Sequence, residues 1–146
     1  VDESKRKGSK LNTVKVDIDR TTNYITIWDN GGIPVVKHTQ HKEWIPEMIF
    51  SNLKAGSNFN DEEQRTGAGT NGVGSTLTNI YSKEFTVTTC DGANHFTQTF
   101  SNNMRKRTAP KHLRLKRYTK AQILHAACTC RWLTYYWRIF SCSTCR

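Results

Sequence analysis

Hydrophobic and polar residues alternate over the first part of the chain. Val14, Val16 and Ile18 are separated by charged residues, and this period of two is typical of a strand with one buried face. A turn-prone stretch follows at 20–23, and the apolar-rich segment 24–28 has strand composition. The pattern therefore predicts an antiparallel hairpin over residues 14–28.

A different period begins further along the chain. Between residues 42 and 53 the large apolar residues recur at helical spacing, and they are Trp44, Ile45, Met48, Ile49 and Leu53. Pro46 is compatible with a helix only in its first turn. The spacing predicts a helix whose apolar face packs into the core.

The segments 84–90 and 95–100 have strand composition, and the turn residues 91–94 join them into a second predicted hairpin. Between the hairpins, residues 75–81 can start a second helix. The predicted fold class is therefore α+β: a two-layer sandwich with a mixed, mostly antiparallel sheet and helices on one face.

Charge divides the chain into two parts. Of the 146 residues, 1–103 carry 11 Lys and Arg against 12 Asp and Glu, whereas 104–146 carry 11 against none, which accounts for the net charge of +10. We therefore predict a domain over residues 1–108. We expect residues 109–146, a basic tail rich in Cys and Trp, to lie outside this domain without defined packing.

The chain has no apolar run long enough to cross a membrane and does not begin with a signal-peptide pattern. Only Cys90 precedes the tail, and reduced thiols are the default for such a sequence. We expect a cytoplasmic protein that has no membrane partner.

The glycine-rich stretch 65–75 is the first candidate site, since four of the nine glycines fall within residues 67–74. Glycine permits positive φ and lets an anion approach the backbone N–H groups. A following helix would add unpaired N–H donors. The stretch is either a phosphate cradle or a flexible surface loop, and it matches neither the Walker nor the dinucleotide-binding pattern.

The second candidate is Asp29, at the end of a predicted strand and beside Gly31 and Gly32. A carboxylate in a dry pocket can accept a hydrogen bond from the exocyclic amine of a ligand. It can equally form an Asx turn that ends the strand, and both interpretations stay open.

The order of these motifs resembles the ATP-binding region of type II DNA topoisomerases. The matching segments are 29–34, 54–59 and 66–75, and the resemblance covers about residues 1–108. Order and spacing are similar to the large ATPase subunit of bacteriophages related to the T-even group and, more distantly, to gyrase B. The resemblance implies a partial Bergerat-type ATP-binding fold.

The resemblance also implies roles for individual residues. The nucleotide-binding positions would be Asp29, Gly31, Gly32, Ile33, Asn58, Gly69, Asn71, Gly72, Val73 and Gly74. Asp29 would bind the adenine amino group, Asn58 would belong to a lid, and residues 69–74 would wrap the phosphates. The family usually has one more residue between the two glycines of the first motif. Its absence predicts a shift of Gly32 and Ile33 relative to the base.

In this family, ATP with Mg²⁺ closes the lid and dimerises two ATPase domains as a gate through which DNA is passed. The implied partners are DNA, other topoisomerase subunits and a second copy in the gate, in the host cytoplasm if the protein is phage-encoded. The general-base Glu and the magnesium-binding Asn are expected upstream of Val1. The chain as given should therefore bind ATP but be deficient in hydrolysis, with no catalytic or metal-binding residue of its own.

The tail suggests an alternative function. Cys128, Cys130, Cys142 and Cys145 could supply four thiolates to zinc, although accidental cysteines are the favoured interpretation. Eight Lys or Arg residues within 105–120 could bind nucleic-acid phosphates, or form a solvated linker. The alternative is therefore a non-enzymatic nucleic-acid-binding module that acts through this tail.

Overall fold

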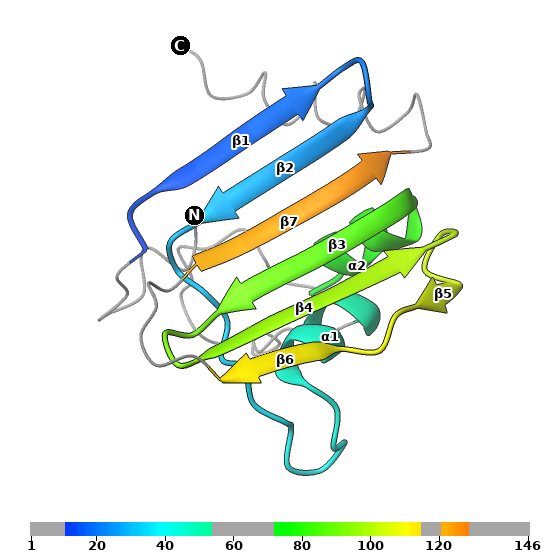
Figure 1. Cartoon of the computed structure of the whole chain (residues 1–146). Coiled ribbons are helices and arrows are strands. Elements are labelled where there is room, and N and C mark those ends of the chain that lie inside the picture. Colours follow the sequence, from blue (N-terminus) through cyan, green and yellow to red (C-terminus); the bar gives the residue numbers. More distant parts are fainter. Residues whose placement is uncertain (1–10, 54–71, 115–120, 129–146) are drawn as a thin grey trace, which may run out of the picture.

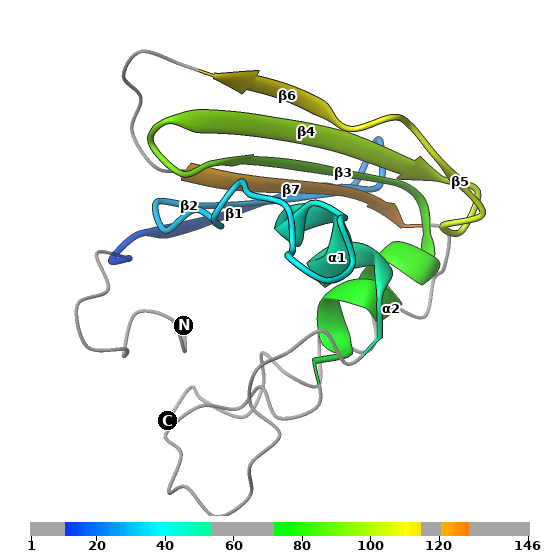
Figure 2. The same ribbon diagram turned by 90° about the horizontal axis from the view of Figure 1, so that it is seen from below.

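The structure is a computed structural model that describes residues 11–53, 72–114 and 121–128. It has two layers, an antiparallel sheet and a pair of helices against one of its faces (Figures 1 and 2). The strands are β1 (Val14–Asp19), β2 (Tyr24–Asp29), β3 (Ser82–Cys90), β4 (Asn94–Ser101), β5 (Lys106–Arg107), β6 (Lys111–Arg114) and β7 (Ala121–Cys128). The helices are α1 (Ile45–Ser51) and α2 (Gly74–Ile80).

The strand order is β1-β2-β7-β3-β4-β5, and β6 pairs with β4. Every one of these pairings is antiparallel. The predicted α+β class, with helices on one face of a mostly antiparallel sheet, is confirmed. Both predicted hairpins are also present, as β1–β2 and β3–β4.

The helix predicted over residues 42–53 forms as the shorter α1, with Pro46 in its first turn. The helix after the glycine stretch forms as α2 and is tied to the end of α1 by buried polar groups. Asn79 donates its side-chain amide to Phe50 O at 3.0 Å, and the Thr76 hydroxyl donates to Asn52 O at 3.0 Å. These bonds fix α2 against α1.

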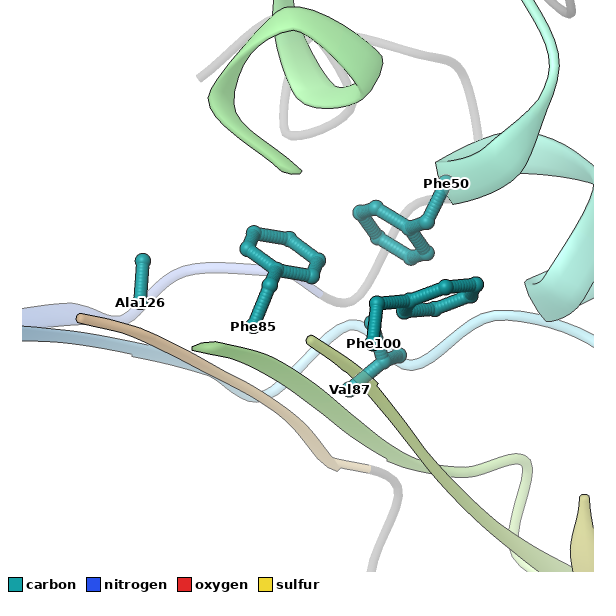
Figure 3. Close-up of a cluster of buried hydrophobic side chains, with 5 residues drawn as sticks. All are labelled: Phe50, Phe85, Val87, Phe100 and Ala126. Atoms are coloured by element: carbon teal, nitrogen blue, oxygen red, sulfur yellow. The ribbon is translucent and has the colours of Figure 1, made fainter. Parts of the chain in front are cut away.

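The core lies between the helices and the part of the sheet formed by β3, β4 and β7 (Figure 3). Phe50 of α1 points toward Phe85 and Val87 of β3 and Phe100 of β4, and Ala126 of β7 lies on the same side. Because side chains alternate between the two faces of a strand, this cluster also identifies which residues of β3, β4 and β7 face the helices.

The prediction that residues 109–146 lie outside the domain is wrong for part of that range. β6 and β7 both belong to the range 109–146, and β7 lies in the sheet between β2 and β3. The step in charge obscured an uncharged, apolar-rich run at 121–128, and such a run is typical of a strand with neighbours on both sides. The sheet therefore continues past the boundary predicted after Thr108. Residues 129–146 lie outside the described residues.

Within the described ranges, neither helix has the length and apolar character that crossing a bilayer requires.

Candidate functional site

Asp29 is the last residue of β2 and is half-buried. Its Oδ1 accepts the Gly31 N–H at 2.8 Å, which forms the turn that ends the strand. Within the described part of the chain, no hydrogen bond to its Oδ2 is found. The two sequence-based interpretations of this carboxylate are therefore compatible, because one oxygen makes the turn and the other can accept a further hydrogen bond.

The sheet register fixes which way Asp29 faces. Ile25 of β2 is paired with Ala126, which faces the helices, and Asp29 has the same parity as Ile25. Gln122 of β7 is paired with Asp29 on one side and with Thr89 of β3 on the other. Asp29 and Thr89 thus stand on the helix-bearing face, two strand spacings or about 10 Å apart.

Two glycines shape the turn after Asp29. A Cβ on Gly31 would lie 2.6 Å from Leu11 Cδ1 and 3.1 Å from Asp29 Oδ1. Gly32 has a φ of 69°, in the left-handed region that favours glycine. A side chain at either position would disturb the turn that orients the Asp29 carboxylate.

The loop after these glycines is tied back onto the sheet. The Ile33 N–H donates to Thr89 Oγ1 at 2.9 Å, and the Val35 N–H donates to Asp91 Oδ2 at 3.0 Å. Ile33 also packs against the core cluster. The missing residue between the glycines therefore does not release the loop, since both anchors are made within a few residues of it.

Asp91 is itself held in place by several backbone groups. Its Oδ1 accepts the N–H groups of Ala93 at 2.9 Å and of Asn94 at 2.7 Å. Burial opposes ionisation, but the N–H groups of Ala93, Asn94 and Val35 lower the pKa of Asp91 below its ordinary value. The carboxylate is thus a charged anchor that joins the loop after β2 to the β3–β4 turn.

Asn30 fixes the other side of the same loop. Its Oδ1 accepts the N–H groups of Asn12 and Thr13, both at 3.1 Å, just before β1 begins. Sequence reasoning identified Asp29 and the glycines but missed Asn30, Thr89 and Asp91, which position them. The sequence feature that could have identified these three residues is their position as polar residues at the ends of apolar strands.

The described part of the glycine stretch begins at Gly72, whose φ of 59° fits the predicted need for glycine. Val73 precedes α2, and α2 begins at Gly74, where an added Cβ would meet nothing within 4 Å. Packing therefore does not require glycine at position 74. The other predicted members, Asn58, Gly69 and Asn71, lie outside the described residues.

The two candidate segments share one side of the sheet. Ile33, from the loop after Asp29, and Ile49, from α1, pack against the same core cluster, and α2 is bonded to α1. Figure 2 shows that both helices lie on a single face of the sheet. The Asp29 carboxylate and the start of α2 therefore belong to the same helix-bearing side.

No group of three His, Cys, Asp or Glu side chains suited to a metal ion occurs in the ranges that the structure describes. Cys130, Cys142 and Cys145, three of the four predicted zinc ligands, fall outside those ranges, and only the backbone of Cys128 is described within β7.

Comparisons with known proteins point to one group. The chain is 44% identical over 112 residues to DNA topoisomerase 2 of Bombyx mori, which covers 75% of this chain and 7% of that protein. It is 45% identical over 120 residues to DNA topoisomerase 2 of Acanthamoeba polyphaga mimivirus, covering 79% of this chain and 10% of that protein. No family model matches the chain.

A solved structure points to the same group of proteins. The ATPase region of Saccharomyces cerevisiae topoisomerase II is similar with a TM-score of 0.77 and 31% identity, over 82% of this chain and 32% of that one. This chain thus spans a small part of the length of the relatives it matches. The bacteriophage affiliation stays a prediction.

Proposed function

This chain is a homologue of the ATPase region of type II DNA topoisomerases, and from that premise we propose that it contributes the adenine-binding side of an ATP site. The observation that carries the proposal is the Asp29 carboxylate, held by Gly31 through one oxygen and facing the helix-bearing side with the other. The absence of a Cβ at Gly31 lets Leu11 and the Asp29 carboxylate pack directly against this turn, which keeps the carboxylate in place.

ATP would be held by contacts at both of its ends. Asp29 would accept a hydrogen bond from the adenine amino group, and Gly31, Gly32 and Ile33 would line the base. The proposed phosphate-binding residues are Asn58, Gly69, Asn71, Gly72, Val73 and Gly74. Backbone N–H groups at positive φ suit an anion, and Gly72 has this conformation.

Asp29 would confer selectivity for adenine because an ionised carboxylate accepts hydrogen bonds and donates none. A base that presents a carbonyl oxygen in place of the amine would face the carboxylate with no proton between them, and an unpaired buried acceptor is costly. Thr89 and Asp91 would act indirectly, by holding the loop that carries Ile33 and Val35.

Magnesium would enter with the nucleotide, bound largely to phosphate oxygens and water. At the level of the whole protein, we propose the activity of the relatives. ATP would drive DNA strand passage by a homodimer that closes through the ATPase gate, together with other topoisomerase subunits. We propose a cytoplasmic location, in the host cell if the protein is phage-encoded.

The test is a titration of the chain with a fluorescent ATP analogue, with and without Mg²⁺. Asp29→Asn should weaken binding about tenfold or more, because an amide has a single acceptor oxygen and must turn its NH2 group toward either the Gly31 N–H or the adenine amine. The matched control is Glu84→Gln, an exposed carboxylate on the opposite face of the sheet. Equal affinity in the parent, Asp29→Asn and Glu84→Gln proteins would refute the proposal.

The comparisons give the alternative, a nucleic-acid-binding module acting through the basic tail, no support. It makes a distinct prediction all the same. DNA binding would fall steeply with salt, as phosphate contacts do, and ATP analogues would neither bind nor compete.

A further inference from the structure

The end of α1 is capped by side chains of α2, which lies beside it (Figure 2). The last carbonyl groups of a helix have no donor within the helix, and a glycine turn or solvent often satisfies them. Asn52, the residue after α1, instead has an extended backbone. Its carbonyl oxygen accepts the Thr76 hydroxyl, and Phe50 O accepts the Asn79 side-chain amide, both at 3.0 Å. These two bonds, here called the interhelix cap, come from the helix that follows α1 in the sequence.

The donors lie on one face of α2. The Ser75 hydroxyl is 3.4 Å from Ile49 O, and positions 75, 76 and 79 have the spacing that places side chains on one side of a helix. Thr76 and Asn79 are 0% exposed. Because water does not compete for buried hydrogen bonds, the interhelix cap holds the two helices in one relative position.

Asn79 makes its bond at a cost. Its Oδ1 is buried and, among the described residues, has no hydrogen-bond partner. An unpaired buried oxygen is unfavourable, and an apolar side chain of similar size would avoid it. What Asn79 contributes is therefore the bond from its amide to Phe50 O, which an apolar side chain cannot make.

The interhelix cap ties together two distant points of the chain. α1 ends at Ser51 and α2 begins at Gly74. Gly72 and Val73, two of the proposed phosphate-binding residues, directly precede α2, and the Leu77 N–H donates to Val73 O at 2.9 Å. A fixed α2 therefore fixes the end of the glycine stretch that leads into it.

The other end of α2 is also held. The Asn103 side-chain amide donates to Ile80 O at 3.0 Å. Asn103 lies in a run of three non-glycine residues, 102–104, with φ values of 55°, 57° and 63°, and Met104 packs against the core cluster. Such a backbone conformation persists only where the surroundings hold it. α2 is thus anchored along its whole length, to α1 at one end and to the 102–104 turn at the other.

We propose that Thr76 and Asn79 are positioning residues for ATP. Through the interhelix cap they would hold Gly72 and Val73 where the phosphates bind, so that less of this segment has to be ordered on binding. This role rests on the proposed ATP site and adds two buried residues that do not touch the nucleotide.

The two ends of the nucleotide should respond differently to loss of the interhelix cap. The loop after Asp29 is held by Thr89 and Asp91, and neither belongs to the helices. Removing the cap should therefore weaken the contacts of the phosphates and leave those of the adenine intact. A general loss of structure would weaken both.

The experiment compares ATP with Mg²⁺ and adenosine, which lacks the phosphates, in titrations followed by the NMR signal of the Gly31 amide. Thr76→Val keeps the shape of the side chain and removes the hydroxyl. It should weaken ATP binding about fivefold, as expected for one lost hydrogen bond, and leave adenosine binding unchanged. Thr76→Ser keeps the hydroxyl and should bind ATP like the parent. Thr86→Val, the same change on the opposite face of the sheet, is the matched control.

A second measurement needs no nucleotide. The Asn52 N–H donates to Met48 O at 3.0 Å in the last turn of α1, and the Leu77 N–H donates to Val73 O in the first turn of α2. Hydrogen exchange at both amides should be faster in Thr76→Val than in the parent, while the core amide of Val87 keeps its rate.

The outcomes separate this role from the proposed function. Unchanged exchange at Asn52 and Leu77, ATP binding by Thr76→Val equal to that of the parent, or an equal loss of ATP and adenosine affinity would each overturn the positioning role. A parent that binds neither ligand would refute the proposed function itself, and the exchange rates would then decide whether the interhelix cap holds the two helices together.

Discussion

The two halves of the sheet follow the same alternating pattern and have different environments. On the helix-bearing face of β3 and β4, Phe85, Phe96 and Phe100 are at most 2% exposed. On the same face of β1, Val16 and Ile18 are about half exposed. The difference is due to the helix layer, because α1 and α2 cover the half of the sheet that contains β3 and β4 and do not cover the half that contains β1 and β2 (Figure 2). A period of two specifies which side chains share a face, and the neighbouring layer decides how deeply they are buried.

The Asp29 part of the candidate site lies on the less covered half. Asp29 ends β2 beside the exposed strand, whereas the groups that hold its loop, Thr89 and Asp91, come from the covered half. A ligand needs open surface, and precise positioning needs a packed support. The comparison therefore predicts that stability depends mostly on the covered half and binding mostly on the uncovered one.

The largest effect is expected in the covered core. Phe85→Ala removes a ring that packs against Phe50 and Phe100, at centroid distances of 5.8 and 6.4 Å. The loss of buried area and the cavity left behind should cost about 3–5 kcal/mol of unfolding free energy. Urea denaturation measures the unfolding free energy. A loss smaller than the loss caused by truncating an exposed side chain would contradict the assignment of Phe85 to the core.

A smaller effect is expected where the two halves are joined. Asp91→Ala removes the acceptor of the Val35, Ala93 and Asn94 N–H groups, at a cost of about 1.5–3 kcal/mol. Asp91→Asn, which keeps one oxygen, should lose less.

This contribution should also depend on pH. The folded-state pKa of Asp91 is lowered, so its stabilisation is present above the unfolded pKa of about 3.9 and is lost as pH falls through the lower folded value. The stability difference between the parent and Asp91→Asn should thus be constant near neutrality and shrink below about pH 4. A difference that grows on acidification would contradict this sign.

Gly31→Ala probes the close contact beside the site. The new Cβ would lie 2.6 Å from Leu11 Cδ1, and accommodating it should cost about 1–2 kcal/mol. Because the clash is with the end of a flexible side chain, the second substitution Leu11→Ala should recover part of the loss. Absence of any such recovery in a double-mutant cycle would show that the backbone, and not Leu11, limits the space.

The smallest effect is expected on the exposed strand. Ile18→Ala, at a position 54% exposed, should change the unfolding free energy by about 1 kcal/mol or less. Urea denaturation measures this change. A cost equal to that of Phe85→Ala would remove the contrast between the halves.

Local patterns predicted much of this fold. Alternation and turn residues predicted both hairpins, and helical spacing predicted α1. β7 was missed because its place between β2 and β3 depends on pairing with strands distant in sequence. The same limit applies to the site, since Thr89 and Asp91 meet the loop after β2 across 56 residues of chain.

The central claim is that the Asp29 turn and the glycine stretch contact one nucleotide. The most direct measurement is the ¹H–¹⁵N spectrum of the chain during titration with ATP and Mg²⁺. The amide signals of Gly31, Gly32 and Gly72 should shift together with one binding constant, while Thr86 and Thr88 on the opposite face stay unchanged. Shifts confined to only one of the two segments, or different binding constants for them, would contradict the claim.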